Sequence, residues 1–282
     1  MSPAQRMPSE GDGYYLGRDY VSSSRLNLMH YLWKDVLGYS IHPDIPVQDS
    51  EDFRIADVGT GTGIWLIDLS RQLHSARLDG FDISTDQFPP KQWLPENMSL
   101  HTLDILKPIP EEFKGKYDVV HARLLLPLVK NNDPTPVLKN MFSLLKPGGY
   151  LQWSDHNVTT WSIVTASPEL GSSKVRAMIE ETDKLAPSKL NWLSQLPYNF
   201  IKQGLQDVSH RLHPPPPDLR LFLAQVHCVF AEEINLVAMG SNGADHGVPS
   251  NRRQIQEAAK EAQEGAAIQY VFECTVGRKP VA

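Results

Sequence analysis

The chain has 282 residues, of which 41% are apolar and 21% charged, and its formal net charge is −6. This is the composition of a globular protein, and the length allows one large domain or a core domain with a substantial cap. The acidic balance argues against a nucleic-acid-binding protein, which needs a concentrated basic surface, and the two widely separated cysteines lack metal-ligand spacing, so neither a disulfide framework nor a metal site is expected.

The N-terminal segment, residues 1–13, is rich in Pro, Ser and Gly, so we expect a disordered lead-in. It has no apolar signal region, and no apolar run in the sequence is long enough to span a bilayer. We therefore expect a cytoplasmic protein that does not contact membranes.

A helical cap is expected over residues 14–40. Val21–Leu37 carries apolar residues at helical spacing, and Ser22–Ser24 can cap the start of the helix. This helix is expected to pack on the core and also to close over a ligand, with Tyr20 or Arg25 reaching inward.

The most informative stretch is 53–63, FRIADVGTGTG, where an apolar, β-branched strand runs into a glycine-rich turn. Glycines lack the Cβ atom that would keep a ligand away from the main chain. The dinucleotide fingerprint needs a glycine where this chain has Ile64 or Leu66, depending on the register. The turn therefore predicts a cofactor other than a dinucleotide.

Two acidic residues follow the next two predicted strands. Asp82 ends the strand that starts at Arg77, where a carboxylate can accept hydrogen bonds from both ribose hydroxyls of a nucleoside. Asp104 and Ile105 follow the strand Met98–Leu103, where an acid and an apolar side chain can hold an adenine ring. The alternatives are that Asp82 caps a helix or turn and that Asp104 caps a loop.

The later elements continue the alternation of strands and helices that is typical of a parallel, doubly wound sheet. A helix is expected over Pro136–Leu145, capped by Lys146–Gly149. The remaining strands are expected at Tyr117–Ala122, Tyr150–Ser154, Leu205–Leu212 and Ile268–Val276.

The segments DVGTGTG, FDIS, LDIL, YDVVHARLLL and LLKPGGYLQW, in this order within residues 53–155, resemble class I S-adenosylmethionine (SAM) methyltransferases. The segments YYLGRDYVSSSRLNLMHYLW and GRKP resemble fungal small-molecule methyltransferases of secondary metabolism, a group that includes relatives of the LaeA-type regulator. The resemblance implies SAM as cofactor and one Rossmann-like, doubly wound, seven-stranded domain over residues 14–282. It also implies helical lid insertions within 156–250 and a final strand that is an antiparallel edge strand.

The resemblance also implies roles for single residues. The implied cofactor contacts are Gly59, Thr60 and Gly61 at the amino-acid part of SAM, Asp82 at the ribose, Asp104 and Ile105 at the adenine, and His121 beside the sulfonium. Further cofactor-binding residues are expected to be Tyr20, Arg25, Asp57 and Ile83. Methyl transfer depends largely on holding donor and acceptor in line, with modest help in losing a proton. The candidate catalytic residues are His121, Asp155 and His156, because histidine titrates near neutral pH and Asp155 ends a predicted strand.

The second half of the chain is expected to bind the substrate. The aromatic residues Trp161, Trp192, Tyr198 and Phe222 are expected to line an apolar pocket or to pack in the core. The helix 218–239 is apolar enough to need burial, either in the roof of the active site or in a homodimer.

The sequence therefore favours SAM-dependent methyl transfer to O, N or S of a small, aromatic or apolar secondary metabolite. Two alternatives keep the SAM site. One is an enzyme of the cyclase or pericyclase type that uses bound SAM without methyl transfer, and the other is a LaeA-like regulatory protein that acts through partners.

Overall fold

The computed structural model describes residues 16–185, 192–242 and 248–281, so the expected lead-in at 1–13 lies outside the described residues. The described chain forms two compact units. What we call the sheet unit contains 33–157, 192–214 and 271–281, and the helical unit contains 16–32, 158–185 and 215–270. Three elements run from one unit into the other: α1 (Tyr20–Leu37), β5 (Leu145–Thr165) and β7 (Ala266–Arg278).

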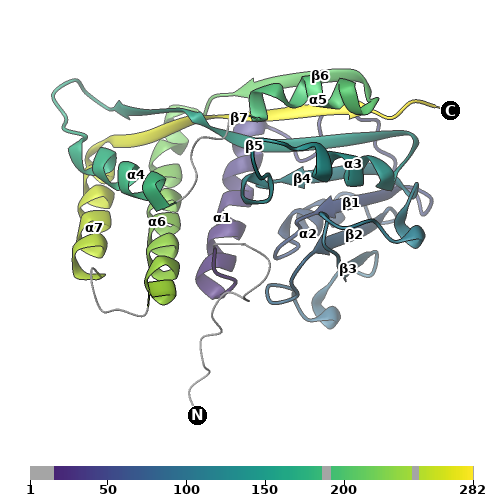
Figure 1. Ribbon diagram of the computed structural model, residues 1–282, viewed down its shortest axis with the longest axis horizontal. Coiled ribbons are helices and arrows are strands. Elements are labelled where there is room, and N and C mark those ends of the chain that lie inside the picture. The colour runs from purple at the N-terminus through teal and green to yellow at the C-terminus, as the bar shows by residue number, and fades with distance from the viewer. Residues whose placement is uncertain (1–15, 186–191, 243–247, 282) are drawn as a thin grey trace, which may run out of the picture. The chain divides into compact units, whose positions relative to one another are not determined.

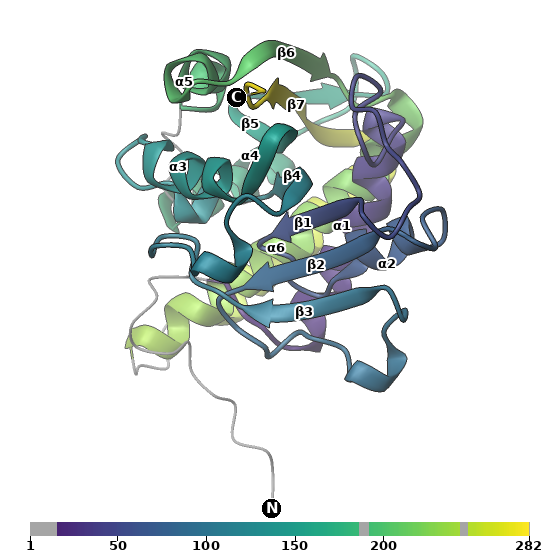
Figure 2. The ribbon, with the colours of Figure 1, turned by 90° about the vertical axis from the view of Figure 1, so that its right-hand side faces the viewer.

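Seven strands form one sheet in the described chain, in the order β3-β2-β1-β4-β5-β7-β6. Figure 2 shows β3, β2, β1 and β4 side by side in this order. The strands not yet delimited are β1 (Arg54–Val58), β2 (Arg77–Asp82), β3 (Met98–Thr102), β4 (Tyr117–Arg123) and β6 (Gln206–His213). The first five strands pair in parallel with their neighbours, which confirms the predicted doubly wound, seven-stranded fold.

The core of the sheet unit lies around β1, where Ile55, Ala56 and Val58 are at most 1% exposed. Such continuous apolar runs are typical of parallel strands that are covered on both faces. The helices of this unit are α2 (Ile64–Ser70), α3 (Thr135–Leu144), α5 (Leu196–Gln203) and the short 3₁₀ turns η1 (Lys91–Trp93), η2 (Glu111–Phe113), η3 (Leu126–Leu128) and η4 (Leu193–Gln195). The short turn η1 stands where a doubly wound fold usually has a helix, and the three prolines between 89 and 95 account for this, because proline breaks helices.

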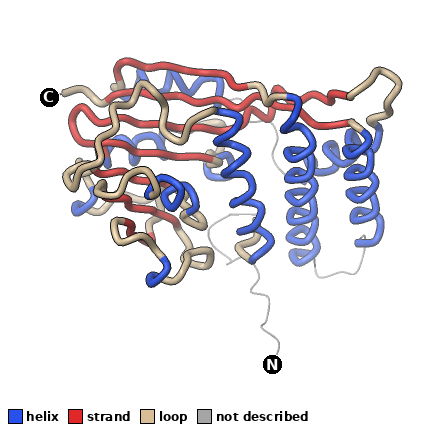
Figure 3. The backbone as a smooth tube through the Cα atoms, turned by 180° about the vertical axis from the view of Figure 1, so that it is seen from behind, coloured by secondary structure: helices blue, strands red, loops and turns tan. Residues whose placement is uncertain are grey.

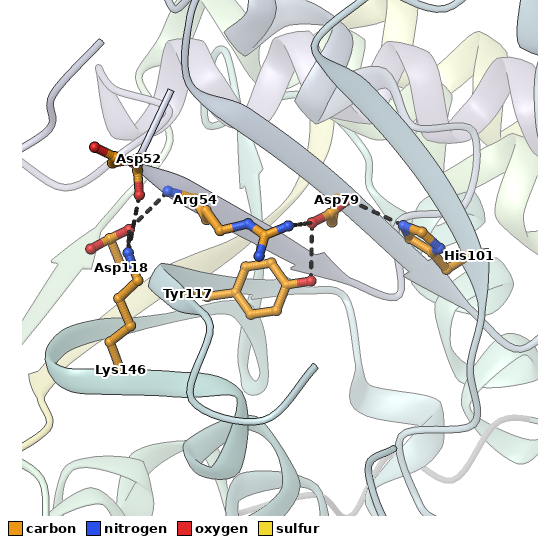
Figure 4. A network of polar contacts seen from close by, with 7 residues as sticks. All are labelled: Asp52, Arg54, Asp79, His101, Tyr117, Asp118 and Lys146. Atoms are coloured by element: carbon orange, nitrogen blue, oxygen red, sulfur yellow. Dashed lines mark hydrogen bonds and ion pairs between the residues drawn. The ribbon is translucent and has the colours of Figure 1, made fainter. Parts of the chain in front are cut away.

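A polar network joins the first four strands (Figure 4). Asp79 on β2 accepts hydrogen bonds from the Tyr117 hydroxyl on β4 at 3.0 Å and from His101 Nε2 on β3 at 3.1 Å, and lies 3.9 Å from the Arg54 guanidinium on β1. A buried carboxylate is stable only when it is paired. The network therefore helps to fix the alignment of these strands.

The segment Lys146–Gly149 does not cap α3, contrary to the sequence prediction. The helix ends at Leu144, and the following residues begin β5. Lys146 Nζ instead pairs with Asp118 Oδ2 at 2.7 Å (Figure 4), and a Cβ atom on Gly149 would lie 2.8 Å from the Tyr117 carbonyl oxygen. Gly149 is therefore required where β5 closely approaches β4.

Two strands also differ from the prediction. β5 does not end at Ser154 but continues to Thr165. The last strand, β7, is not at the edge: it lies between β5 and β6, and β6 is the antiparallel edge strand.

The helical unit contains α4 (Ser173–Leu185), η5 (Pro217–Leu219), α6 (Arg220–Asn242) and α7 (Val248–Glu264). The three α-helices lie side by side (Figures 1 and 3). The buried side chains of α6, Leu223, Val226 and Ile234 among them, give this helix the apolar character seen in the sequence. None of the described helices is long and apolar enough to cross a membrane. Within the expected lid segment 156–250, residues 192–214 belong to the sheet unit.

Asp19 caps α1 in place of the predicted serines. Its Oδ1 accepts hydrogen bonds from the N–H groups of Val21 and Ser22, both at 3.0 Å. An aspartate at this position satisfies N–H groups that have no partner within the helix.

Candidate cofactor site

The glycine turn after β1 is held by the end of β2. The N–H groups of Gly59 and Thr60 both donate to the Phe81 carbonyl oxygen, at 2.8 and 3.0 Å. Gly59, Gly61 and Gly63 have φ values of 72°, 52° and 72°, in the left-handed region that favours glycine. A Cβ atom on Gly59 would also lie only 2.7 Å from Leu125 Cδ2. The sequence spacing of the glycines is thus a direct requirement of the turn.

Asp57 and His121 form a buried pair beneath this turn. His121 Nδ1 lies 2.7 Å from Asp57 Oδ1, and the Thr60 hydroxyl donates to Asp57 Oδ2 at 2.8 Å. The His121 ring stacks on Trp65 with centroids 3.8 Å apart. Burial lowers the pKa of His121, although the hydrogen bond to Asp57 opposes this shift. The lowered pKa favours a neutral His121 imidazole, which donates from Nδ1 to Asp57.

Asp82 stands at the end of β2 and contacts the glycine turn directly. Its Oδ2 accepts the Gly61 N–H at 2.9 Å, and its Oδ1 accepts the Ser84 N–H at 3.1 Å. The next side chain, Ile83, is 42% exposed. A half-buried carboxylate beside an exposed apolar side chain presents a polar and an apolar surface to one ligand.

Asp104 and Ile105 follow β3, next to the end of β2. The Leu103 N–H donates to the Asp82 carbonyl oxygen at 2.7 Å, so the two strand ends are neighbours. Asp104 Oδ1 accepts the Leu106 N–H at 3.0 Å, as expected for an acid that caps a loop. Ile105 is buried, and its carbonyl oxygen accepts a hydrogen bond from Asn140 at 2.6 Å.

The other two candidate catalytic residues, Asp155 and His156, lie within β5, directly after its pairing with the end of β4. Asp155 is fully buried, and burial raises its pKa to about 8. Its Oδ2 accepts the Leu125 N–H at 2.9 Å, and its Oδ1 accepts the His156 N–H at 3.2 Å. The side chain of His156 is 20% exposed, compared with 3% for His121.

Sequence reasoning missed Arg123, which ends β4 in the segment YDVVHAR. Its guanidinium lies over the Trp33 ring at 5.5 Å from the centroid. Burial lowers the pKa of Arg123 to about 10, while Asp57 and Asp155 oppose the shift. The signal that could have revealed Arg123 is its position directly after a predicted apolar strand, the same position that Asp82 and Asp104 hold at two other strands.

Tyr20 and Arg25 lie on the part of α1 that belongs to the helical unit. Tyr20 is 82% exposed. Arg25 is buried, and its Nε lies 3.0 Å from Glu233 Oε1 on α6. The structure thus gives Arg25 an ion-pair partner within its own unit.

The four aromatic residues expected at a substrate pocket have different surroundings. Trp192 is buried in the sheet unit with its ring 5.1 Å from that of Trp153, so it packs in the core. Tyr198 and Phe222 are 62% and 48% exposed, and Trp161 is half-buried on the extension of β5.

The model of the methyltransferase domain family matches residues 30–212. This chain belongs to that family. The methyltransferase is 33% identical to methyltransferase grgD of a Penicillium species, over 88% of this chain and 89% of that protein. It is also 33% identical to N-methyltransferase gliN of Aspergillus fumigatus, but this match covers only 53% of the chain and 52% of gliN.

Solved structures show the same fold. Phosphoethanolamine N-methyltransferase 2 of Haemonchus contortus superposes with a TM-score of 0.53 at 13% identity, covering 92% of this methyltransferase and 58% of that chain. A chain of the complex between the Haloferax volcanii Trm112 methyltransferase activator and the putative methyltransferase gives a TM-score of 0.54 at 17% identity, covering 93% and 96%. The methyltransferase is thus a class I, SAM-dependent enzyme.

The residues of the sheet unit fit SAM. Glycines at the turn leave the main chain open to close approach, and Asp82 offers a carboxylate suited to ribose hydroxyls, already oriented by the turn. Asp57 and His121, by contrast, bond to each other beneath the turn. Asp57 also accepts a hydrogen bond from Thr60, and the His121 ring stacks on Trp65, so the pair supports the turn.

Proposed function

We propose that this methyltransferase methylates a heteroatom of a small, apolar or aromatic secondary metabolite, and that nitrogen is the first acceptor to test. The observation that carries the proposal is the similarity to fungal relatives, several of which are named N-methyltransferases. An acceptor of this kind needs no phosphate-binding basic surface, in keeping with the net charge of −6.

In the proposed site, the main chain of Gly59–Gly61 lies against the amino-acid part of SAM, Asp82 binds the ribose, and Asp104 with Ile105 holds the adenine. The exposed Ile83 side chain covers one face of the nucleoside. When bound, SAM would supply an electrophilic methyl group: the acceptor atom would bond to the methyl carbon in line with the breaking carbon–sulfur bond, and S-adenosylhomocysteine would leave as a neutral thioether. The protein's contribution to the rate is to hold the acceptor in that line and to exclude water.

The acceptor loses a proton when it is a protonated amine or a phenol, and His156 is the candidate base. Of the three candidates it is the one with an accessible side chain: 20% exposed, against 3% for His121 and 0% for Asp155. Its ring centroid lies 6.2 Å from that of Trp33. His121 acts indirectly, by keeping Asp57 and the turn in place.

The proposal is tested by incubating the pure protein with methyl-labelled SAM and matched panels of apolar amines, phenols, thiols and carboxylates. We expect label in amines first, and we expect His156→Gln to lower kcat on the order of 10²-fold or more at neutral pH without changing SAM affinity. SAM binding without transfer to any class of acceptor would contradict methylation and favour use of bound SAM without transfer. A homodimer through α6 stays a proposal, which the mass of the intact protein in solution tests.

A further inference from the structure

The turn after β4 is backbone-strained at a residue that is not glycine. Leu124 has a φ of 57°, a region that side chains with a Cβ atom rarely adopt. It directly follows the last residue of β4 and precedes the 3₁₀ turn η3. Strain of this kind persists only where the surroundings hold it, and it clusters at functional sites.

Asp155 helps to hold this turn, together with the Ser154 carbonyl oxygen, which accepts the Leu124 N–H at 3.4 Å. Arg123 and Ser154 are the last paired residues of β4 and β5, so Asp155 is the first residue of β5 beyond the pairing. Its carboxylate reaches across to the N–H of Leu125, at 2.9 Å, and also accepts the N–H of His156, at 3.2 Å. The carboxylate therefore joins the chain that leaves β4 to the chain that continues β5.

Leu125, whose N–H bonds to Asp155, packs against the glycine turn. Its side chain is 3% exposed, and its Cδ2 occupies the space beside Gly59 where a Cβ atom would lie only 2.7 Å away. Gly59 in turn donates its N–H to β2 at 2.8 Å, next to Asp82. A continuous contact path thus leads from Asp155 through Leu125 to the glycine turn.

We propose that Asp155 is a positioning residue: by holding the strained turn at Leu124, it seats Leu125 against Gly59 and fixes the glycine turn in the conformation that binds SAM. Full burial and two backbone donors keep the carboxylate away from the acceptor. The inference rests on the proposed binding of SAM at the glycine turn. It differs from the sequence prediction that Asp155 is a general base.

The test is calorimetric binding of S-adenosylhomocysteine to full-length variants, with kcat and KM for SAM measured in parallel. Asp155→Ala and Leu125→Ala should each weaken binding about tenfold or more, because both release the turn. Asp155→Asn should stay within about threefold of the wild type, because its amide oxygen still accepts the Leu125 N–H. Leu124→Gly in the Asp155→Ala background should recover part of the affinity, since glycine adopts the turn without strain.

Asp79→Ala is the matched control, since it removes a buried carboxylate of β2 whose side-chain hydrogen bonds go to Tyr117 and His101 and not to the turn after β4, so it should lower stability but not affinity. If Asp155→Ala binds S-adenosylhomocysteine as tightly as the wild type while Asp82→Ala binds it more weakly, the role of Asp155 is overturned and the proposed cofactor site stands. If Asp155→Asn loses methyl transfer while Asp155→Ala keeps its affinity for S-adenosylhomocysteine, Asp155 acts as a base, and the inference is overturned. Unchanged affinity in Asp82→Ala would overturn the proposed site itself. If Asp155→Ala does not fold, Leu125→Ala decides: tenfold weakening supports the inference, and wild-type affinity overturns it.

Discussion

Asp82 orients the glycine turn in the structure, and in the proposed site it also binds the ribose of the cofactor. Its bond to the Gly61 N–H, at 2.9 Å, ties the end of β2 to the turn that follows β1. A ligand hydroxyl that binds this carboxylate therefore meets an acceptor whose direction is already set.

Asp82→Ala is expected to weaken SAM binding by about 1–3 kcal/mol, because charge-assisted hydrogen bonds to the ribose are lost. Calorimetry measures this directly. The exposed Asp86, in the same loop, provides the matched control: Asp86→Ala should leave the affinity unchanged. Equal affinities for the wild type and Asp82→Ala would remove Asp82 from the site.

At the residue scale, the sequence could place residues at strand ends but could not show what each side chain faces. Asp82 and Asp104 were correctly predicted to stand at the ends of neighbouring strands. The contact between His121 and Asp57 depends on the register that pairs these two residues across β1 and β4. That register is set by packing on both faces of the sheet, and a run of apolar residues does not encode it.

Among the elements, α1 and α6 are joined by a buried ion pair between Arg25 and Glu233, whose side chains are 6% and 4% exposed. Burial raises the pKa of Glu233, while Arg25 opposes the shift. Arg25 Cζ also lies over the ring of Phe230, one turn from Glu233, at 5.8 Å from the ring centroid. The arginine is therefore both paired and packed.

Arg25→Leu is expected to lower the free energy of unfolding by about 3–5 kcal/mol, because it leaves a buried carboxylate unpaired. The double variant Arg25→Leu/Glu233→Leu should lose much less, since no buried charge remains. Urea unfolding of both single variants and the double variant measures the coupling. Reduced SAM affinity with unchanged stability would instead support the cofactor role that the sequence suggested for Arg25.

A histidine on α6 makes the helical unit sensitive to acid. Burial lowers the pKa of His227 from its ordinary 6.5 to about 4. Between these values the unfolded chain binds a proton that the folded chain does not, so this residue lowers stability as the pH falls. The slope for one proton is at most about 1.4 kcal/mol per pH unit. His227→Gln should show a smaller loss of unfolding free energy between pH 7 and pH 4.5, and an unchanged slope would contradict the assignment.

The elements themselves were predictable where their periodicity was strong, as in α1, β1 and α3. The extension of β5 was missed, although its residues 157–165, NVTTWSIVT, are rich in the β-branched side chains that favour strands. The position of β7 between β5 and β6 was also missed, because the order of strands in a sheet depends on contacts between segments far apart in the chain.

For the whole molecule, SAM should stabilise the folded state by mass action. At a free concentration of 100 times Kd we expect about 2.7 kcal/mol of added unfolding free energy. Denaturant titrations with and without SAM measure this difference. At the same SAM concentration the shift should be smaller for Asp82→Ala, and an equal shift in both proteins would place the SAM contacts elsewhere.

The two units could not be read from the sequence because neither is a continuous segment. The helical unit is assembled from 16–32, 158–185 and 215–270, and the sheet unit from the segments between and after them.

The ion pair between α1 and α6 joins positions 208 apart in the sequence. On a ribosome that adds roughly 5–20 residues per second, about 10–40 s pass between the synthesis of the arginine and that of the glutamate. During this interval the amino-terminal part of α1 must wait without its native partner. Newly made chains should accordingly depend on chaperones that shield this segment. A variant in which synthesis of α6 is delayed should aggregate more than the wild type, even when its folded state is equally stable.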